Sequence, residues 1–202
     1  GGNEFNNNSP ETFTRFYRNH DGRFIRDSFP PIGLSASALV AVDIDLDGDE
    51  DLVIGGKSIP RHYGKPASSY ILVNDGHGHF KDATLDVAPF LMGIGMVQDI
   101  DVADMDGDGR PDLLIASEWS PVMIAMNRPG HFELLKGDDL GIPHSEGWWN
   151  TFIPADFDGD GDLDFIGGNL GLNSKLKATA EHPLILYLAD FDFNGDQEQV
   201  LT

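Results

Sequence analysis

Four stretches of the sequence place oxygen-bearing side chains at every second position around a fixed glycine, with Arg110 as the one exception. They are DIDLDGDED at 43–51, DMDGDGRPD at 104–112, DFDGDGDLD at 156–164 and DFDFNGDQE at 190–198. The four align without a gap, with Asp or Asn at positions 1, 3 and 5, glycine at position 6 and an acid at position 9. So many carboxylates repel one another unless a cation lies among them. The pattern therefore predicts metal-binding loops.

The spacing is typical of calcium. Calcium takes six to eight oxygens at about 2.3–2.6 Å in a flexible shell, and glycine at position 6 permits the sharp turn. Position 7 usually supplies its backbone carbonyl, so Arg110 there does not abolish the second site. Magnesium, which needs a rigid octahedron, and ordinary solvated turns are weaker alternatives. The predicted ligands are Asp43, Asp45, Asp47, Asp49, Asp51, Asp104, Asp106, Asp108, Arg110, Asp112, Asp156, Asp158, Asp160, Asp162, Asp164, Asp190, Asp192, Asn194, Asp196 and Glu198.

The loops are expected to connect strands. An EF-hand places a bidentate Glu at position 12 and continues into a helix, whereas position 12 here is Ile54, Ile115, Gly167 or Leu201. The short apolar runs that follow the first three loops, bounded by small residues, predict buried strands. Strand-like runs also precede the loops. The sequence therefore predicts a strand–loop–strand unit.

A second motif recurs between the acidic loops. Asn-rich and Gly-rich turns at 19–24, 74–80 and 127–132 each end in Phe and join two strand-like runs, which is typical of tight hairpins. The Phe residues are 56 and 52 positions apart, and the first three acidic loops are 61 and 52 apart. A repeat of this length made only of strands predicts an all-β propeller with four-stranded blades.

The predicted blades divide the chain into four parts. Residues 1–28 supply the trailing strands of a preceding blade, and 29–85, 86–136 and 137–202 form one blade each. The fourth acidic loop follows the third by only 34 residues, where the hairpin of the last blade is expected. It is therefore a candidate fourth site beside three predicted ones. About three and a half blades do not close a ring, which favours a fragment of a propeller with six to eight blades.

Composition sets further bounds. The 202 residues carry 34 acids against 13 bases, a formal net charge of −21. More than half of the acids lie in the four loops, and no basic stripe is available for phosphates, so nucleic-acid binding is disfavoured. The chain has no cysteine, and no apolar run approaches the roughly 20 residues that span a bilayer.

The repeated acidic pattern with its Asn-x-Gly-x-Phe hairpins resembles the FG-GAP/VCBS repeats, which form the β-propeller of integrin α-subunits and of many secreted bacterial proteins. Within that group it is most similar to the cartilage acidic protein/UnbV-type proteins and their bacterial relatives. The resemblance covers nearly the whole chain. It implies calcium in the loop between the first two strands of a blade, and it does not specify a function.

Other candidates are weaker. Trp148 and Trp149 lie in a Gly-containing approach to the third blade and are able to stack on sugars, although packing between blades is the simpler interpretation. The locally basic segment 57–66 is a candidate anion site or a solvated loop. No catalytic residue is predicted, because the clustered acids are assigned to calcium and no Ser-His-Asp, phosphate-loop or zinc motif is present.

Together these features predict a non-enzymatic, calcium-stabilised propeller segment of a secreted, periplasmic or cell-surface protein that acts in adhesion or protein recognition. Millimolar extracellular calcium suits such loops. The alternatives are a glycan-binding module, a propeller-type polysaccharide lyase, and a scaffold for a catalytic domain elsewhere in a longer chain. The partner is a protein or a glycan, and the missing blades come from the parent chain or from self-association.

Overall fold

The regular secondary structure of the described residues consists almost entirely of antiparallel strands, as predicted. The structure is a computed structural model that describes residues 13–171, 177–179, 181–195 and 197–202. Its strands are β1 (Phe16–His20), β2 (Arg23–Asp27), β3 (Ser35–Val42), β4 (Asp51–Ser58), β5 (Tyr70–Asn74), β6 (Phe80–Asp82), β7 (Met96–Ala103), β8 (Asp112–Ser120), β9 (Met123–Arg128), β10 (His131–Lys136), β11 (Gly147–Ala155), β12 (Asp164–Asn169), β13 (Leu186–Ala189) and β14 (Glu198–Leu201).

The helical content is small. A single turn α1 (Thr84–Val87) and a short 3₁₀ turn η2 (Pro89–Leu91) connect β6 to β7. Both were absent from the sequence-based prediction, and Ala88 and Leu91 from this connection are buried against the strands. Among the described residues, no helix is long and apolar enough to cross a membrane.

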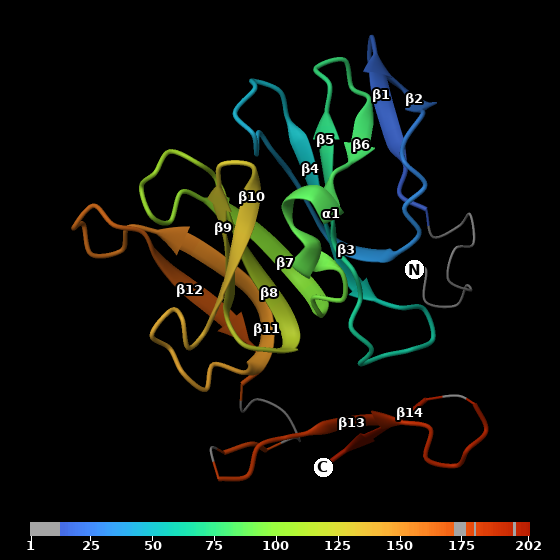
Figure 1. Ribbon diagram of the computed structural model, residues 1–202, viewed down its shortest axis with the longest axis vertical. Coiled ribbons are helices and arrows are strands. Elements are labelled where there is room, and N and C mark those ends of the chain that lie inside the picture. The colour runs from blue at the N-terminus through green and yellow to red at the C-terminus, as the bar shows by residue number, and fades with distance from the viewer. Residues whose placement is uncertain (1–12, 172–176, 180, 196) are drawn as a thin grey trace.

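Two four-stranded meanders form the centre of the molecule. The first has the order β3-β4-β5-β6, and the second runs β7-β8-β9-β10 with every neighbouring pair antiparallel. Strand β11 pairs mainly with β12, and its first two residues pair with the end of β8, which links the third sheet to the second. Figure 1 shows these sheets in succession along the chain.

The sheets stack face to face because the central strands bury both of their faces. Val53 and Ile54 are adjacent on β4, yet Val53 packs toward the second sheet, whereas Ile54 packs toward Ile32 and Phe29. On β8, Leu113 and Leu114 divide in the same way between the first and third sheets. Successive side chains of a strand point to opposite faces. The apolar runs after the first two loops are therefore strands buried on two sides. The third run was also predicted to be a buried strand, but β12 is largely exposed and its Ile166 is 58% exposed.

A close approach between the first two sheets depends on Gly55 of β4. A Cβ atom at this position would lie 2.7 Å from Val97 Cγ1 and 3.0 Å from the Cβ of Ala38. A larger residue here would push β7 away from β4, so the glycine sets the spacing between the sheets.

The N-terminal hairpin packs against the first sheet through the first residue of β1, while most of its other residues are exposed. β1 and β2 form a separate two-stranded sheet, and Phe16 packs with Phe29 and Phe80 at ring-centroid distances of 6.2 and 5.8 Å. The described part of the segment 1–28 is thus a strand pair, while residues 1–12 lie outside the described residues.

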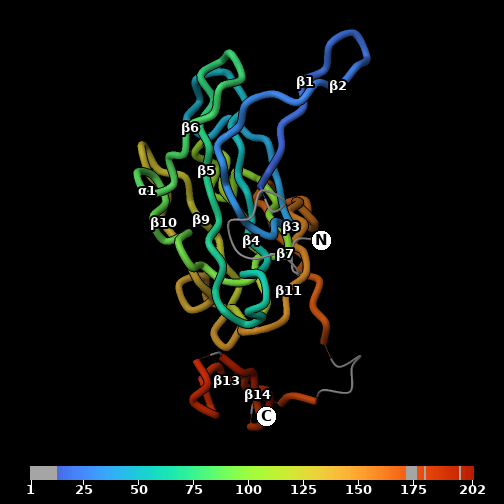
Figure 2. Tube along the Cα trace, turned by 90° about the vertical axis from the view of Figure 1, so that its right-hand side faces the viewer, coloured from blue at the N-terminus to red at the C-terminus, as the bar shows by residue number. Residues whose placement is uncertain are grey.

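The last predicted blade, 137–202, is not a single sheet among the described residues. β11 pairs with β12, and β13 pairs with β14 in a sheet of its own. Figures 1 and 2 both show the β13–β14 pair at one end of the molecule, apart from the stacked sheets. It lies beside the loop after β4, because a Cβ atom at Gly64 would meet Leu186 Cδ2 at 2.7 Å.

Among the described residues, the fourth acidic loop therefore lies outside the sheet of β11 and β12 and connects a strand pair of its own. The loop joins β13 to β14 as the other loops join β3 to β4, β7 to β8 and β11 to β12. The spacing of 34 residues does not by itself state which strands pair. The predicted blade boundaries stay predictions.

Candidate metal centres

All four acidic loops close on the same strand register. In each loop the residue at position 9 pairs with the residue just before position 1, in the pairs Val42↔Asp51, Ala103↔Asp112, Ala155↔Asp164 and Ala189↔Glu198. Because the same two positions pair at the strand ends, each loop connects its strands over the same distance. The predicted strand–loop–strand unit is confirmed in all four copies, including the fourth.

The position-1 carboxylate organises the turn. Asp43 accepts hydrogen bonds from the backbone N–H of Asp47 at 3.1 Å and of Gly48 at 3.0 Å. The position-6 N–H makes the matching bond at 2.8 Å in the second loop, 3.1 Å in the third and 2.9 Å in the fourth. The glycines at position 6 have φ between 86° and 100°, which a side chain would strain. Asp and Gly are thus required for the turn itself.

The position-9 carboxylate ties the end of the loop to its beginning. Its oxygen accepts the backbone N–H of position 2 at 3.1 Å in Asp51, 2.8 Å in Asp112, 3.2 Å in Asp164 and 2.8 Å in Glu198. In the first two loops the other oxygen accepts the N–H of a hairpin Asn, Asn74 at 2.8 Å and Asn127 at 2.7 Å. The sequence motif identified these Asn residues as turn formers and missed this second role.

Carboxylate oxygens converge in every loop. In each of four groups the acids offer oxygens that lie within 4.8 Å of one another: Asp43, Asp45 and Asp51; Asp104, Asp106 and Asp108; Asp156, Asp158 and Asp164; Asp190, Asp192 and Glu198. Oxygens about 2.3–2.6 Å from one ion are at most about 5 Å apart. The spacing therefore suits a single hard cation in each loop.

The other predicted ligands are placed around these groups. Asp47, Asp160 and Asn194 occupy position 5 of their loops, and Asp112 accepts two backbone N–H groups at position 9. Position 7 was predicted to act through its backbone carbonyl, and this role of Asp49, Arg110 and Asp162 remains a prediction. Asp196 lies outside the described residues.

The first two loops hold carboxylates in unfavourable surroundings. Asp51 and Asp112 are 1% and 0% exposed. Burial raises the pKa of Asp51 to about 6, with added repulsion from Asp45 and Asp47, although hydrogen bonds from Asn74 and Ile44 oppose the rise. Burial also raises the pKa of Asp112 and of Asp49. Asp49 Oδ1 is buried without a hydrogen-bond partner. A bound cation would offset these costs, so the residues fit a hard metal ion.

The raised pKa of Asp51 makes the stability of the metal-free protein depend on pH. Because the folded-state pKa is about 6 against a usual value of 3.8, the folded state takes up a proton before the unfolded state does. Stability should therefore rise by about 2–3 kcal/mol as pH falls from above 6 to below 4. Urea denaturation of chelator-stripped protein across this range measures the effect.

Asp51→Asn is the control for this prediction, since it removes the titrating group and keeps the side-chain size. The variant should lose that share of the pH dependence. Equal slopes in the two proteins would contradict the assignment to Asp51. With saturating calcium the trend should reverse, because protonation competes with the metal.

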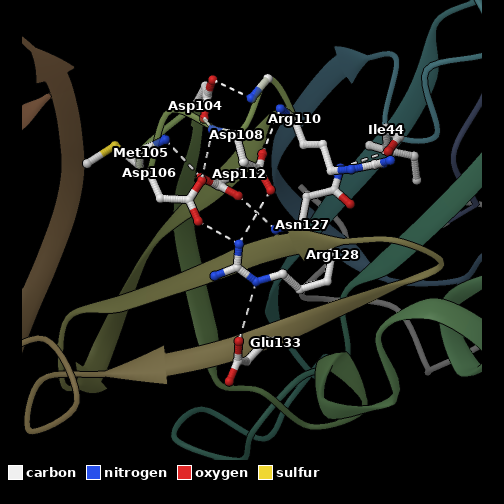
Figure 3. Close-up of polar contacts among 11 residues, drawn as sticks. Ile44, Asp104, Met105, Asp106, Asp108, Arg110, Asp112, Asn127, Arg128 and Glu133 are labelled. Carbon is white, nitrogen blue, oxygen red and sulfur yellow. Dashed lines mark hydrogen bonds and ion pairs between the residues drawn. The ribbon is translucent and has the colours of Figure 1, made fainter. Parts of the chain in front are cut away.

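A basic side chain that the sequence-based analysis missed faces the second loop. Arg128 Nη1 lies 2.5 Å from Asp106 Oδ2 and 3.4 Å from Asp108 Oδ2, and its Nε lies 3.5 Å from Glu133 Oε2. Figure 3 shows the guanidinium between the loop and β10. The hydrogen bond from Arg128 holds the pKa of Asp106 below its usual value. Arg128 directly follows the hairpin Asn127, which is the only sequence signal for its place.

The two predicted Trp candidates have different surroundings. Trp149 packs against Phe152 with ring centroids 5.3 Å apart and donates its indole N–H to the carbonyl of Ser145 at 2.9 Å. The ring centroids of Trp148 and Trp119 lie 5.4 Å apart. Trp149 is therefore a packing residue between β11 and the second core cluster, as the simpler interpretation held.

Trp119 belongs to a polar network at the end of β8, away from the acidic loops at its start. Its indole N–H donates to Tyr63 Oη at 3.2 Å, and Tyr63 donates to Glu118 Oε2 at 2.7 Å. The basic segment 57–66 lies alongside, where Ser58, Ile59, Arg61 and Tyr63 line a cavity of about 260 Å³ with Gln199. Sequence reasoning placed Tyr63 in the candidate basic segment but missed Trp119 and the contact between these two residues, which are 56 positions apart.

Comparison with known proteins identifies the repeat. A family model described as FG-GAP-like repeat matches residues 62–115 and 104–167, which together cover more than half of the chain. Human phosphatidylinositol-glycan-specific phospholipase D is 28% identical over 101 residues. The match covers 48% of this chain and 12% of that protein.

The matched ranges contain the second acidic loop twice and the third once, together with the strands that flank them. The family model thus spans the second and third acidic loops and not the first or fourth, and the resemblance to this repeat family is confirmed. The chain belongs to the FG-GAP-like repeat family.

Proposed function

We propose that this chain is a calcium-stabilised β-propeller segment that acts in adhesion or protein recognition in a secreted or surface protein. The observation that carries the proposal is the repetition of one loop template in four strand pairs, each with carboxylate oxygens within 4.8 Å of one another. Sheets that stack face to face in chain order support the propeller arrangement. Calcium in this role is structural, since binding energy gained in the folded loop becomes folding energy.

The proposed extracellular or periplasmic location follows from the calcium affinity expected of such loops. Loops of this class in extracellular modules bind calcium at about 10⁻⁴–10⁻³ M, which matches extracellular and not cytosolic concentrations. A non-catalytic role is the simplest one for the acids, because a carboxylate bound to calcium is a poor general base. Protein–protein recognition would then use other loops of the blades.

Direct metal binding tests the proposal. Equilibrium dialysis of the purified protein against calcium, with metal analysis of both compartments, should give at least three ions per chain and no more than four. Magnesium at the same concentration should leave most sites to calcium. Fewer than one bound calcium ion per chain, or equal binding of magnesium, would contradict the calcium assignment.

A scaffold for a catalytic domain is the second candidate, and the comparison with a protein named as a phospholipase favours it. The chain matches only 12% of that protein's length, so catalysis there does not transfer to these residues. In this case the parent protein should keep its substrate chemistry when its repeat segment is replaced by another FG-GAP segment, whereas a recognition module should lose its partner.

Glycan recognition is a narrower form of the binding role. The pair Trp119 and Trp148 with Tyr63 offers aromatic surface beside a polar network. A glycan array separates the two classes: binding that is lost in Trp148→Ala and kept in Phe24→Ala, which removes an exposed aromatic ring from β2, supports a sugar ligand. The absence of any glycan signal supports a protein partner.

A further inference from the structure

The second acidic loop already contains a cation supplied by the protein. We propose that Arg128 is an internal counter-ion of this loop, which holds its carboxylates together without metal and competes with calcium for them. The second loop should then bind calcium more weakly than the first. The inference rests on the proposed calcium binding and adds a difference among the four loops.

Arg128 contacts the oxygens that the backbone leaves free. Asp106 Oδ1 accepts the N–H of Asp108 at 3.3 Å, and Asp108 Oδ1 accepts the N–H of Arg110 at 2.9 Å. The Oδ2 atoms of both acids face Arg128 Nη1, at 2.5 and 3.4 Å. These are the oxygens of positions 3 and 5 that remain for a metal. Arg128 therefore occupies lone pairs of the oxygens that a metal would use and places a positive charge beside them, so the guanidinium and calcium compete for these two carboxylates.

The guanidinium is held in this position from two sides. Asn127, the residue before Arg128, is 3% exposed, and its Nδ2 donates to the carbonyl of Ile44 at 2.7 Å. Its backbone N–H donates to Asp112, as described above. On the other side Glu133 of β10 lies 3.5 Å from Arg128 Nε. Since the backbone is fixed and the side chain is bracketed by acids, little further entropy is lost when Arg128 pairs with the loop.

The first loop offers an internal comparison. The N–H of Asn74 donates to Asp51 as that of Asn127 donates to Asp112, so Asp75 stands where Arg128 stands in the second sheet. Asp75 turns into its own hairpin, where it accepts the N–H of His77 and pairs with His79 Nδ1 at 2.9 Å. Asp49 Oδ1 in the same loop is buried and unpaired. The first loop thus has an acid in place of the arginine.

Coulomb repulsion between Arg128 and a bound calcium ion determines how much weaker calcium binding should be. Arg128, Asp106 and Asp108 are 29%, 31% and 33% exposed, so water screens them substantially. At such a site the repulsion between one positive charge and a calcium ion a few ångströms away corresponds to roughly a tenfold change in binding constant. Removing the charge should restore about that factor.

The test follows one backbone amide in each loop. Gly48, Gly109, Gly161 and Gly195 each donate to the position-1 carboxylate, so their amide resonances report on metal at their own loop. Calcium-loaded protein labelled with ¹⁵N-glycine is back-titrated with a chelator, which starts from the folded state. In the natural protein the Gly109 resonance should release calcium first, at about tenfold higher free calcium than Gly48.

Arg128→Gln removes the charge and should lower the Gly109 midpoint at least fivefold while Gly48 stays within twofold. Arg128→Lys, which keeps the charge, should leave the Gly109 midpoint near its original value. Asp75→Asn at the equivalent hairpin position should leave Gly109 unchanged. If Arg128→Gln does not fold, Arg128→Met gives the same readout.

The outcomes separate the two proposals. If Gly48 and Gly109 titrate together in the natural protein, or if neutral variants at 128 do not move Gly109, Arg128 is not a competing cation. If no glycine amide responds to calcium in any loop, the calcium function itself fails, and with it the basis of this inference.

Discussion

Removing calcium should lower the melting temperature of this protein by about 10–25 °C. A loop with a dissociation constant near 10⁻⁴ M gains about 1–2 kcal/mol at millimolar calcium. Three or four such loops together contribute about 4–7 kcal/mol, a large share of the 5–15 kcal/mol that holds a typical domain folded. For a chain of this size each kcal/mol moves the melting temperature by about 2–4 °C.

Differential scanning calorimetry in millimolar calcium and in excess chelator measures this shift, with magnesium at the same concentration as the ionic control. A variant with Asn at position 1 of all four loops (Asp43, Asp104, Asp156 and Asp190) should lose the difference between the two conditions. Coincident melting curves and far-UV spectra of the natural protein with and without calcium would rule out the structural role.

The second large effect is expected at position 9, where the acids of equivalent loops differ in burial. Asp112→Ala should destabilise the chelator-stripped protein by about 2–4 kcal/mol, because the backbone N–H groups of Met105 and Asn127 lose their acceptor in a site that water does not reach. Relief of the buried charge, which raises the pKa of Asp112, offsets part of that loss. The expected loss of stability is therefore smaller than the full cost of leaving two backbone N–H groups unpaired.

Asp164→Ala is the matched control at the same position of the third loop. Asp164 is exposed, and its described backbone contact is with the N–H of Phe157 at 3.2 Å. Water can replace that acceptor, so the loss should stay below about 1 kcal/mol. Guanidinium denaturation of both variants without metal compares them. Equal destabilisation would show that the loop position, and not its burial, sets the cost.

The acidic loops could be predicted from sequence because their geometry is local. Each loop is shaped by bonds among nine consecutive residues, such as those from Gly48 to Asp43 and from Ile44 to Asp51. The same holds for the central strands β4 and β8 that follow the first two loops, whose apolar residues alternate between two buried faces. Even the fourth loop, at an unexpected spacing, has the local bonds of the others.

Contacts between distant segments were not visible in the sequence. Asn127 joins the second hairpin to the carbonyl of Ile44 across 83 positions, and Arg128 reaches the second loop from the same strand end. The place of β13 and β14 in a separate sheet also depends on strand pairing, which spacing alone does not specify.

The amino-acid sequence by itself thus determined the family, the all-β class and the acidic residues that converge in each loop. Tertiary structure decided how the loops differ. Asp112 is buried and Asp164 exposed because the second sheet is packed between two others, and Arg128 lies against the second loop because Asn127 is fixed by its hydrogen bonds to Asp112 and Ile44. Burial and neighbouring charge depend on which sheets stack together. They make loops of nearly the same sequence differ in their surroundings.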